Sequence, residues 1–178
     1  MLRELGFDVI FADEISRRLL DPGQAAYDET VREFGQEIIR PDGTLDRKKI
    51  AAIVFADRGE LDRLNAIIHP RVEVQILKQF ADWEREENRP VAFVEAALLV
   101  EAGYMKNLDG LVVTWCRPEQ QVERLVARGM TDEEARTRIG AQMPVEEKLK
   151  LADYKIDCSG SIEETRRQVV ELAQGFGG

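Results

Sequence analysis

Cysteine and histidine are scarce in this sequence of 178 residues, which contains Cys116, Cys158 and a single histidine, His69. The two cysteines stand far apart and form no CxxC pair, so thiol and imidazole ligands are too few for a structural zinc site. A low cysteine content also argues against a disulfide-stabilised secreted domain. We therefore expect a reduced, cytoplasmic protein.

Long apolar runs and basic stretches are also missing. No segment approaches the roughly 18 to 20 apolar residues of a membrane span, and residues 1–5 have neither the basic nor the apolar region of a signal peptide. The formal net charge is −9 and the sequence pI is near 4.8, so the surface on average repels phosphodiester backbones. Neither a membrane nor a nucleic acid is an expected partner.

The residues that are present predict one α/β domain. Hydrophobic residues make up 44% of the chain, enough to bury one substantial core. Apolar runs predict strands at residues 8–11, 91–94, 111–115 and 154–157, and the second and third are typical of strands covered on both faces of a parallel sheet. Helical patterns fill the intervening segments, as crossover connections between parallel strands do.

Helical periodicity predicts helices over residues 25–38, 46–55, 60–68, 70–87, 118–128, 131–142 and 161–174. Capping boxes begin the last two, Thr131 with Glu134 and Ser161 with Glu164. The mostly helical span 25–87 is longer than a simple crossover. We therefore predict that this span forms an inserted lobe.

A carboxylate and a guanidinium, Asp13 and Arg17, lie four residues apart where the first predicted strand passes into a helix. The carboxyl end of a parallel strand faces the ligand crevice of an α/β sheet. There Asp13 could accept a proton from a substrate hydroxyl, while Arg17 could pair with a phosphate through its planar fork of donors. The same spacing also suits a helix-capping aspartate beside a solvated arginine.

Basic side chains are concentrated in the span 117–148. Mobile arginines above a nucleotide can neutralise charge that develops during phosphoryl transfer. Neighbouring glutamates at helical spacing could pair with them instead, and the basic residues would then form an ordinary solvated face. The basic residues are Arg117, Arg124, Arg128, Arg136, Arg138 and Lys148, with Gln142 between the last two, and the neighbouring glutamates are Glu119, Glu123, Glu133 and Glu134.

Three further residues are candidates for catalysis or for metal binding. His69 precedes Pro70 at the junction of two helical patterns, where a lone histidine is more often a structural donor than a catalyst. Glu95 and Glu101 follow the second predicted strand, where a carboxylate can hold magnesium directly or through water. Simple exposure beyond the core accounts for these two carboxylates equally well.

Taken in order, these residues and their neighbours resemble the dephospho-coenzyme A kinase family over almost the whole chain, from about Leu5 to Leu172. Many ordered matches carry the resemblance, which makes it more specific than any single motif. The matching stretches are Leu5-Gly6, Ala12-Asp13-Glu14-Ile15 with Arg17, Phe34-Gly35, Asp42-Gly43-Thr44-Leu45-Asp46-Arg47, Ile53-Val54-Phe55, Leu64-Asn65-Ala66-Ile67-Ile68-His69-Pro70, Leu98-Leu99 with Glu101, Arg124-Leu125 with Arg128, Gln142-Met143-Pro144, Glu147-Lys148, Ala152-Asp153, Ile156-Asp157 and Ser159-Gly160-Ser161.

The resemblance implies an enzyme that uses ATP and Mg²⁺ to phosphorylate the ribose 3′-hydroxyl of dephospho-coenzyme A, as a monomer or a small homo-oligomer. It also implies the fold of P-loop NTPases, a parallel sheet flanked by helices, with an inserted helical lobe for coenzyme A and a helical lid. In this single domain the implied core covers about 1–24, 88–117 and 152–174, the lobe about 25–87 and the lid about 118–151.

Residue roles follow from the matched positions. By the resemblance, Asp13 would be the base that accepts the proton of the 3′-hydroxyl, with Arg17 and His69 near the coenzyme A substrate. Glu95 would be associated with magnesium through water. The residues implied to bind ATP are Arg128, Arg138 and Gln142 in the lid, and Asp157, Ser159 and Gly160 near the adenine.

The sequence also departs from the family pattern. The family often has Asp where Phe11 stands, Asp-Ile-Pro where residues 95–97 stand, and Asn where Cys158 stands. It opens with a strand and a glycine-rich GxxxxGK(S/T) loop, yet no Gly-Lys pair occurs in this sequence. We therefore predict that the first strand and the phosphate-binding loop are missing, that this chain folds poorly or exposes a cleft in its sheet, and that it is inactive.

Two other functions stay open. The chain could be a relative that binds a coenzyme A-like ligand without catalysis, because the loop that cradles the β- and γ-phosphates is the part predicted to be missing. It could also be a different P-loop nucleoside or nucleotide kinase of similar architecture.

Overall fold

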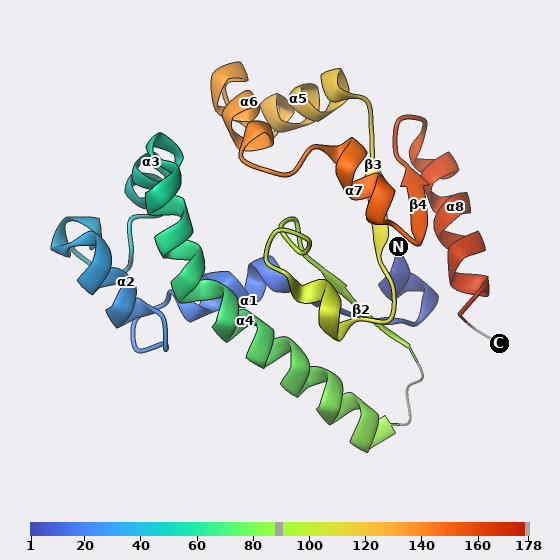
Figure 1. The fold of residues 1–178 in the computed structure, drawn as a ribbon, viewed down its shortest axis with the longest axis horizontal. Coiled ribbons are helices and arrows are strands. Elements are labelled where there is room, and N and C mark those ends of the chain that lie inside the picture. Colours follow the sequence, from blue (N-terminus) through green and yellow to red (C-terminus); the bar gives the residue numbers. More distant parts are fainter. Residues whose placement is uncertain (88–90, 177–178) are drawn as a thin grey trace. The chain divides into compact units, whose positions relative to one another are not determined.

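The computed structural model describes residues 1–87 and 91–176, which form two compact units (Figure 1). The first, here called the α4 unit, is Val9–Ala97, and the second, the β3–β4 unit, combines Met1–Asp8 with Leu98–Gly178. Helices and paired strands occur in both units, so the predicted α/β class is confirmed. The division into core, lobe and lid stays a prediction, and residues 88–90, where the predicted lobe meets the core, lie outside the described residues.

All the predicted strands are present within one residue of their expected bounds. They are β1 (Asp8–Phe11), β2 (Ala92–Glu95), β3 (Val112–Trp115) and β4 (Tyr154–Asp157). They pair as two two-stranded sheets, β1 with β2 and β3 with β4. The second pair is parallel, with Val112 opposite Tyr154 and Trp115 opposite Asp157.

The burial of β2 and β3 differs from the prediction of strands covered on both faces. No β2 side chain is fully buried, and Thr114 in β3 is exposed. Each strand has one paired neighbour within the described residues, so each keeps an open edge. A two-stranded ribbon is too narrow for helices to cover both of its faces, which explains the partial exposure.

The α4 unit is organised around one long helix, α4 (Arg58–Glu87). Three shorter helices, α1 (Ala12–Leu19), α2 (Tyr27–Phe34) and α3 (Arg47–Ala56), pack against it, and a 3-10 turn, η2 (Gln36–Ile38), follows α2 (Figure 1). Buried residues recur at helical spacing and make one continuous core. They include Ala12, Ile15 and Leu19 in α1, Ile50 and Val54 in α3, and Leu64, Ile67, Ile68, Val72 and Ile76 in α4.

The prediction of two helices meeting at Pro70 is wrong, because α4 runs through this proline without a break. Proline inside a helix removes one backbone hydrogen bond and costs about 3 kcal/mol. On either side of Pro70, however, Ile67, Ile68, Val72 and Ile76 bury their side chains in the same core. At about 1.5 to 3 kcal/mol for each buried side chain, this packing outweighs the local cost.

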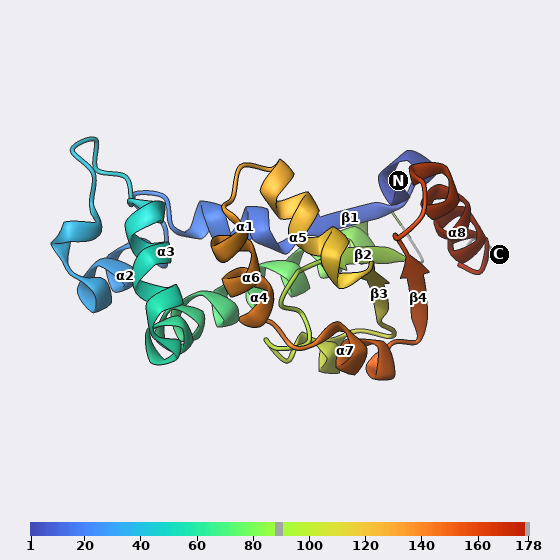
Figure 2. The ribbon, with the colours of Figure 1, turned by 90° about the horizontal axis from the view of Figure 1, so that it is seen from above.

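The β3–β4 unit returns from β3 to β4 through three helices, α5 (Pro118–Ala127), α6 (Asp132–Gly140) and α7 (Val145–Leu151). α8 (Ile162–Gln174) then packs against β4 and against η1 (Leu2–Leu5), while a further 3-10 turn, η3 (Tyr104–Asn107), precedes β3 (Figure 2). Within the described residues, no helix is long and apolar enough to cross a membrane.

Both predicted capping boxes are confirmed. The Thr131 hydroxyl accepts from the backbone N–H of Glu134 at 3.2 Å, and the Glu134 carboxylate accepts from the backbone N–H of Thr131 at 2.8 Å. Ser161 and Glu164 do the same at 3.1 and 2.7 Å. Helix α7 was not predicted, although glutamates in its first turn and lysines in its last turn match the helix dipole.

Thr30 provides a test of core packing in the α4 unit. Its side chain is fully buried in α2, and its hydroxyl has no hydrogen-bond partner among the described residues. We expect Thr30→Val to leave the free energy of unfolding unchanged or to raise it by about 1 kcal/mol, because the substitution keeps the shape and removes an unsatisfied polar group. Urea unfolding followed by circular dichroism measures the difference.

Thr165 in α8 is the matched control, since it is also buried but its hydroxyl donates to the backbone oxygen of Ser161 at 3.2 Å. Thr165→Val should therefore lower stability by about 0.5 to 1.5 kcal/mol. Equal losses in both variants would contradict the explanation.

Candidate functional site

Asp13 and Arg17 lie on the exposed face of α1, whose other face buries Ala12, Ile15 and Leu19. The alternative that Asp13 caps the helix is wrong, because the N-cap residue is Phe11 and no side-chain cap is present. Asp13 instead stands in the first turn, where the helix dipole favours a negative charge. Residues four apart on a helix are neighbours, so Arg17 is placed one turn below the carboxylate.

His69 lies in α4 and is half-buried, next to the core residue Ile68. It belongs to the α4 unit together with Asp13 and Arg17, and α1 packs against α4 in this unit. The backbone of α1 is further tied by Arg47, whose guanidinium donates to the Arg17 carbonyl at 3.1 Å. Three of the predicted site residues are therefore carried by two helices that share one core.

Glu95 stands at the end of β2 with an exposed side chain. Among residues 1–87 and 91–176, no group of three or more histidine, cysteine, aspartate or glutamate side chains could hold a metal ion. Magnesium in phosphoryl-transfer sites usually takes one or two carboxylates and completes its shell with water and phosphate oxygens. A single exposed carboxylate is compatible with that mode.

The turn that follows β4, residues 157–161, is the most densely connected of the predicted sites. The Asp157 carboxylate accepts from the backbone N–H of Ser159 at 2.7 Å, which closes an Asx-type turn. The side-chain amide of Gln168 in α8 binds both backbone groups of Asp157, at 2.8 Å each. The amide of Gln168 thus pairs with the backbone of Asp157 as a neighbouring strand would, and this pairing fixes the start of the turn.

Helix α5 holds the other side of this turn. Gln120 donates to the carbonyl of Ser159 at 2.9 Å, and Arg124 donates to the carbonyl of Cys158 at 2.6 Å. Gly160 has no side chain, and a Cβ at this position would lie 2.1 Å from the Glu164 carboxylate that caps α8. The turn is therefore positioned from both flanking helices, and glycine leaves room for the cap.

Two polar groups of the turn, the Asp157 carboxylate and the Ser159 hydroxyl, lie close together and affect each other. The pKa of Asp157 is lowered from its ordinary value, first by the nearby Ser159 hydroxyl, then by the Ser159 backbone N–H, and also by the positive charge of Arg117. The Ser159 hydroxyl itself is buried and makes no hydrogen bond of ordinary geometry with a described residue. An anionic carboxylate at the start of the turn is suited to accepting hydrogen bonds from a bound ligand.

The predicted arginines of the lid are placed on α5 and α6. Arg128 is the C-cap residue of α5 and Arg138 stands in the last turn of α6, both with exposed side chains, whereas Gln142 follows α6 and is half-buried. Arg136 pairs with Asp132 at 2.6 Å, and this pair raises the pKa of the guanidinium. Arg136 therefore forms an ordinary solvated ion pair, as one of the two interpretations of these basic residues predicted. Its partner is an aspartate and not one of the expected glutamates.

Lys148 and Glu101 form a half-buried ion pair at 2.9 Å, so in this structure the Lys148 ammonium group is neutralised by Glu101. The same Glu101 oxygen accepts from the backbone N–H of Met143 at 2.8 Å. Partial burial works to raise the pKa of Glu101, but the hydrogen bonds from Lys148 and Met143 outweigh it and hold the pKa below its ordinary value. Glu101 thus anchors the connection between α6 and α7.

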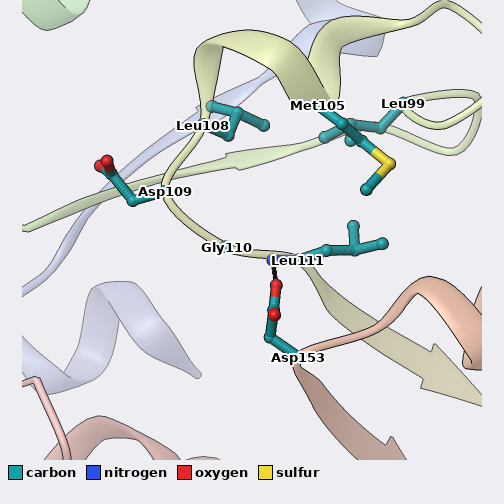
Figure 3. Close-up of a pocket in the computed structure, with 7 residues that line it drawn as sticks. All are labelled: Leu99, Met105, Leu108, Asp109, Gly110, Leu111 and Asp153. Atoms are coloured by element: carbon teal, nitrogen blue, oxygen red, sulfur yellow. Dashed lines mark hydrogen bonds between the residues drawn. The ribbon is translucent and has the colours of Figure 1, made fainter.

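A small cavity also occurs in the β3–β4 unit (Figure 3). Its volume of about 80 Å³ is far below that of ligand pockets, which run from about 300 to 1,000 Å³. Figure 3 shows Met105 and Leu111 pointing toward one another across it, and the Asp153 carboxylate accepts from the backbone N–H of Leu111 at 2.8 Å. None of the predicted site residues lines it.

Comparisons with known proteins point to one family. A family model described as dephospho-CoA kinase matches residues 1–164. The dephospho-CoA kinase of Symbiobacterium thermophilum is 45% identical over 170 residues, 95% of this chain and 71% of the relative, and that of Carboxydothermus hydrogenoformans is 43% identical over 175 residues, 98% and 84%. The chain belongs to the dephospho-CoA kinase family.

Solved structures agree with this assignment. A crystal structure of a Thermus thermophilus protein is similar with a TM-score of 0.80 at 32% identity, covering 99% of this chain and 88% of that one. The dephospho-CoA kinase of Campylobacter jejuni is similar with a TM-score of 0.67 at 30% identity, covering 97% and 86%. The α/β fold that the resemblance implied is thus shared with both of these structures, one of which is a dephospho-CoA kinase.

Glu101→Gln tests the anchor between α6 and α7. At neutral pH we expect a loss of about 1 to 3 kcal/mol in the free energy of unfolding, because the amide cannot replace a charged acceptor of two hydrogen bonds. The lowered pKa of Glu101 means that its stabilisation is complete above the ordinary glutamate pKa and disappears as pH falls through the folded-state value. Urea unfolding between about pH 7 and pH 3 measures both effects.

Glu147→Gln is the matched control, because Glu147 pairs with Lys150 in α7 but both side chains are more than half exposed. This variant should lose less than about 0.5 kcal/mol. The anchor would be refuted if the stability gap between Glu101→Gln and the wild type stayed the same at every pH.

Proposed function

We propose that this protein transfers the γ-phosphoryl group of ATP to the ribose 3′-hydroxyl of dephospho-CoA. Family membership over residues 1–164 carries the proposal. The exposed carboxylate of Asp13 at the start of α1 supports it, because phosphoryl transfer to a hydroxyl needs a group that accepts the hydroxyl proton.

In the proposed reaction Asp13 accepts the 3′-hydroxyl proton while the oxygen of that hydroxyl forms a bond to the γ-phosphorus. The bond from that phosphorus to the bridging oxygen breaks, and ADP leaves with the electron pair. Arg17, one helical turn from Asp13, is suited to pair with a phosphate of the coenzyme A substrate through its fork of donors. His69 is proposed to contact the same substrate from α4.

ATP is proposed to bind along the turn at residues 157–161. Asp157, Ser159 and Gly160 form this turn, and the Asp157 carboxylate, which accepts from the backbone N–H of Ser159, fits a role near the adenine. Arg128 and Arg138, which are exposed on α5 and α6, are suited to neutralise phosphate charge, with Gln142 beside them.

Magnesium is proposed to be held near Glu95 through water. When bound, the ion would neutralise charge on the β- and γ-phosphate oxygens. The carboxylate of Glu95 contributes a hydrogen-bond acceptor for the water that the ion carries. The cytoplasmic location and the monomeric or small oligomeric state stay predictions.

The phosphate-binding loop is part of the proposal. The sequence contains no Gly-Lys pair, so these 178 residues do not supply the amides and lysine of a GxxxxGK(S/T) loop that would cradle the β- and γ-phosphates. The predictions that the loop and first strand are missing, and that the chain as printed is inactive, both stay open to test.

An ADP-release assay tests the proposed reaction. A chain carrying a strand and a GxxxxGK(S/T) loop ahead of Met1 should release ADP with dephospho-CoA as acceptor and not with nucleosides or nucleotides, because the family match specifies the acceptor. The chain as printed is the control and should show no turnover. Calorimetry with dephospho-CoA on the same two proteins measures binding separately.

The outcomes distinguish the competing functions. Nucleoside or nucleotide phosphorylation by the extended chain would identify a different P-loop kinase. Ligand binding without turnover in both proteins would favour a non-catalytic binding protein, which the missing Gly-Lys pair supports.

Asp13→Asn in the extended chain tests the proposed base. We expect kcat to fall by about 10² to 10⁴-fold, since the amide cannot accept the proton, while binding of dephospho-CoA stays close to that of the wild type. Glu14→Gln is the matched control, because Glu14 is the next residue of α1 and is also exposed. Similar kcat values for Asp13→Asn and Glu14→Gln would rule out the assigned role.

A further inference from the structure

The two cysteines, far apart in the sequence, lie at the ends of paired strands. The parallel register places Trp115 opposite Asp157, and the ladder continues by one bond, from the backbone N–H of Cys158 to the carbonyl of Trp115 at 2.7 Å. The next pair in this register is Cys116 with Cys158. Directly paired residues project to the same face of a sheet, and neighbouring strands are about 4.8 Å apart.

This separation suits a disulfide, in which the Cα atoms usually lie about 4.4 to 6.8 Å apart. Both residues are free cysteines in the structure. Burial raises the pKa of Cys116, and the nearby Cys158 adds to this rise, whereas Arg124 opposes it.

Helix α5 holds both cysteine backbones from one of its faces. Gln121 donates to the carbonyl of Cys116 at 3.1 Å, and Arg124 donates to the carbonyl of Cys158 at 2.6 Å. Residues three apart on a helix are neighbours, so the two donors act as a single clamp. The clamp keeps the strand ends together beyond the last paired residues, where they would otherwise diverge.

The two thiols differ in access. Cys158 is partly exposed, whereas Cys116 is 8% exposed and burial raises the pKa of its thiol. An oxidant in solution therefore reaches Cys158 first. Cys116 is shielded from solvent and is placed to attack only a sulfur that is already beside it.

We propose that Cys116 and Cys158 are a dithiol site that forms a reversible intramolecular disulfide by exchange with a small-molecule disulfide. The Cys158 thiolate attacks one sulfur of the oxidant, and a first small thiol leaves. Cys116, after losing its proton, attacks the Cys158 sulfur, which releases the second small thiol and leaves the Cys116–Cys158 bond. One disulfide is reduced to two thiols while the protein dithiol is oxidised, so the electrons balance.

The bond closes a ring that contains α5, α6 and α7. Because the ring returns to the turn at residues 157–161, oxidation ties both ends of this helical segment together. Reduction by an excess of small thiol reverses the step.

Oxidised glutathione is the probe. After incubation with the folded chain of 178 residues, we expect a mass loss of about 2 Da with no glutathione attached, two thiols protected from alkylation, and one linked peptide pair containing Cys116 and Cys158. Dithiothreitol should restore both thiols. In urea the same chain should close at least about tenfold more slowly, because the strand pairing and the α5 clamp that hold the thiols together are lost.

Cys116→Ser and Cys158→Ser are the controls, and Cys158→Ser should also react more slowly with the probe than Cys116→Ser. Stable glutathione adducts on both cysteines, linkage only between two chains, or equal closure rates with and without urea would each overturn the proposal.

Discussion

The parallel pairing of β3 with β4 governs the organisation of the β3–β4 unit. Parallel strands cannot be joined by a tight hairpin, so the chain must return over a dozen or more residues before it can pair again. Here α5, α6 and α7 make that return. The register then brings the end of β3 beside the end of β4, which lets Gln120 and Arg124 reach the backbone of the turn at residues 157–161.

Features that depend on local sequence could be predicted well. The strands follow from short apolar runs, and the capping boxes at Thr131 and Ser161 follow from residue spacing alone. Features that depend on distant contacts could not. The continuity of α4 through Pro70 rests on core packing on both sides of the proline, and the Glu101–Lys148 pair joins residues far apart in the sequence.

In the candidate site, too, the residues set by local sequence could be predicted and those that depend on distant contacts could not. Asp13 and Arg17 could be found because they follow a strand at helical spacing, but only the structure shows that Phe11, and not Asp13, is the N-cap residue. Gln168 was missed, although it lies seven residues after the helix-capping Ser161 and so on the same face of α8. Nothing in an isolated glutamine indicates that its amide will bind both backbone groups of another residue.

Helix α4 divides into halves with different local stability. Among the side chains of α4 that the structure describes, the last buried one is Ile76, while Val74 is 66% exposed and Leu77 is 41% exposed. Further along, Phe80 contacts Trp83 of the same helix. Segments with few buried contacts open by local unfolding at a much smaller free-energy cost than the core. We therefore expect the half that follows Ile76 to open at a smaller free-energy cost than the half that carries His69, so motion at one end of this helix need not reach the proposed substrate residues.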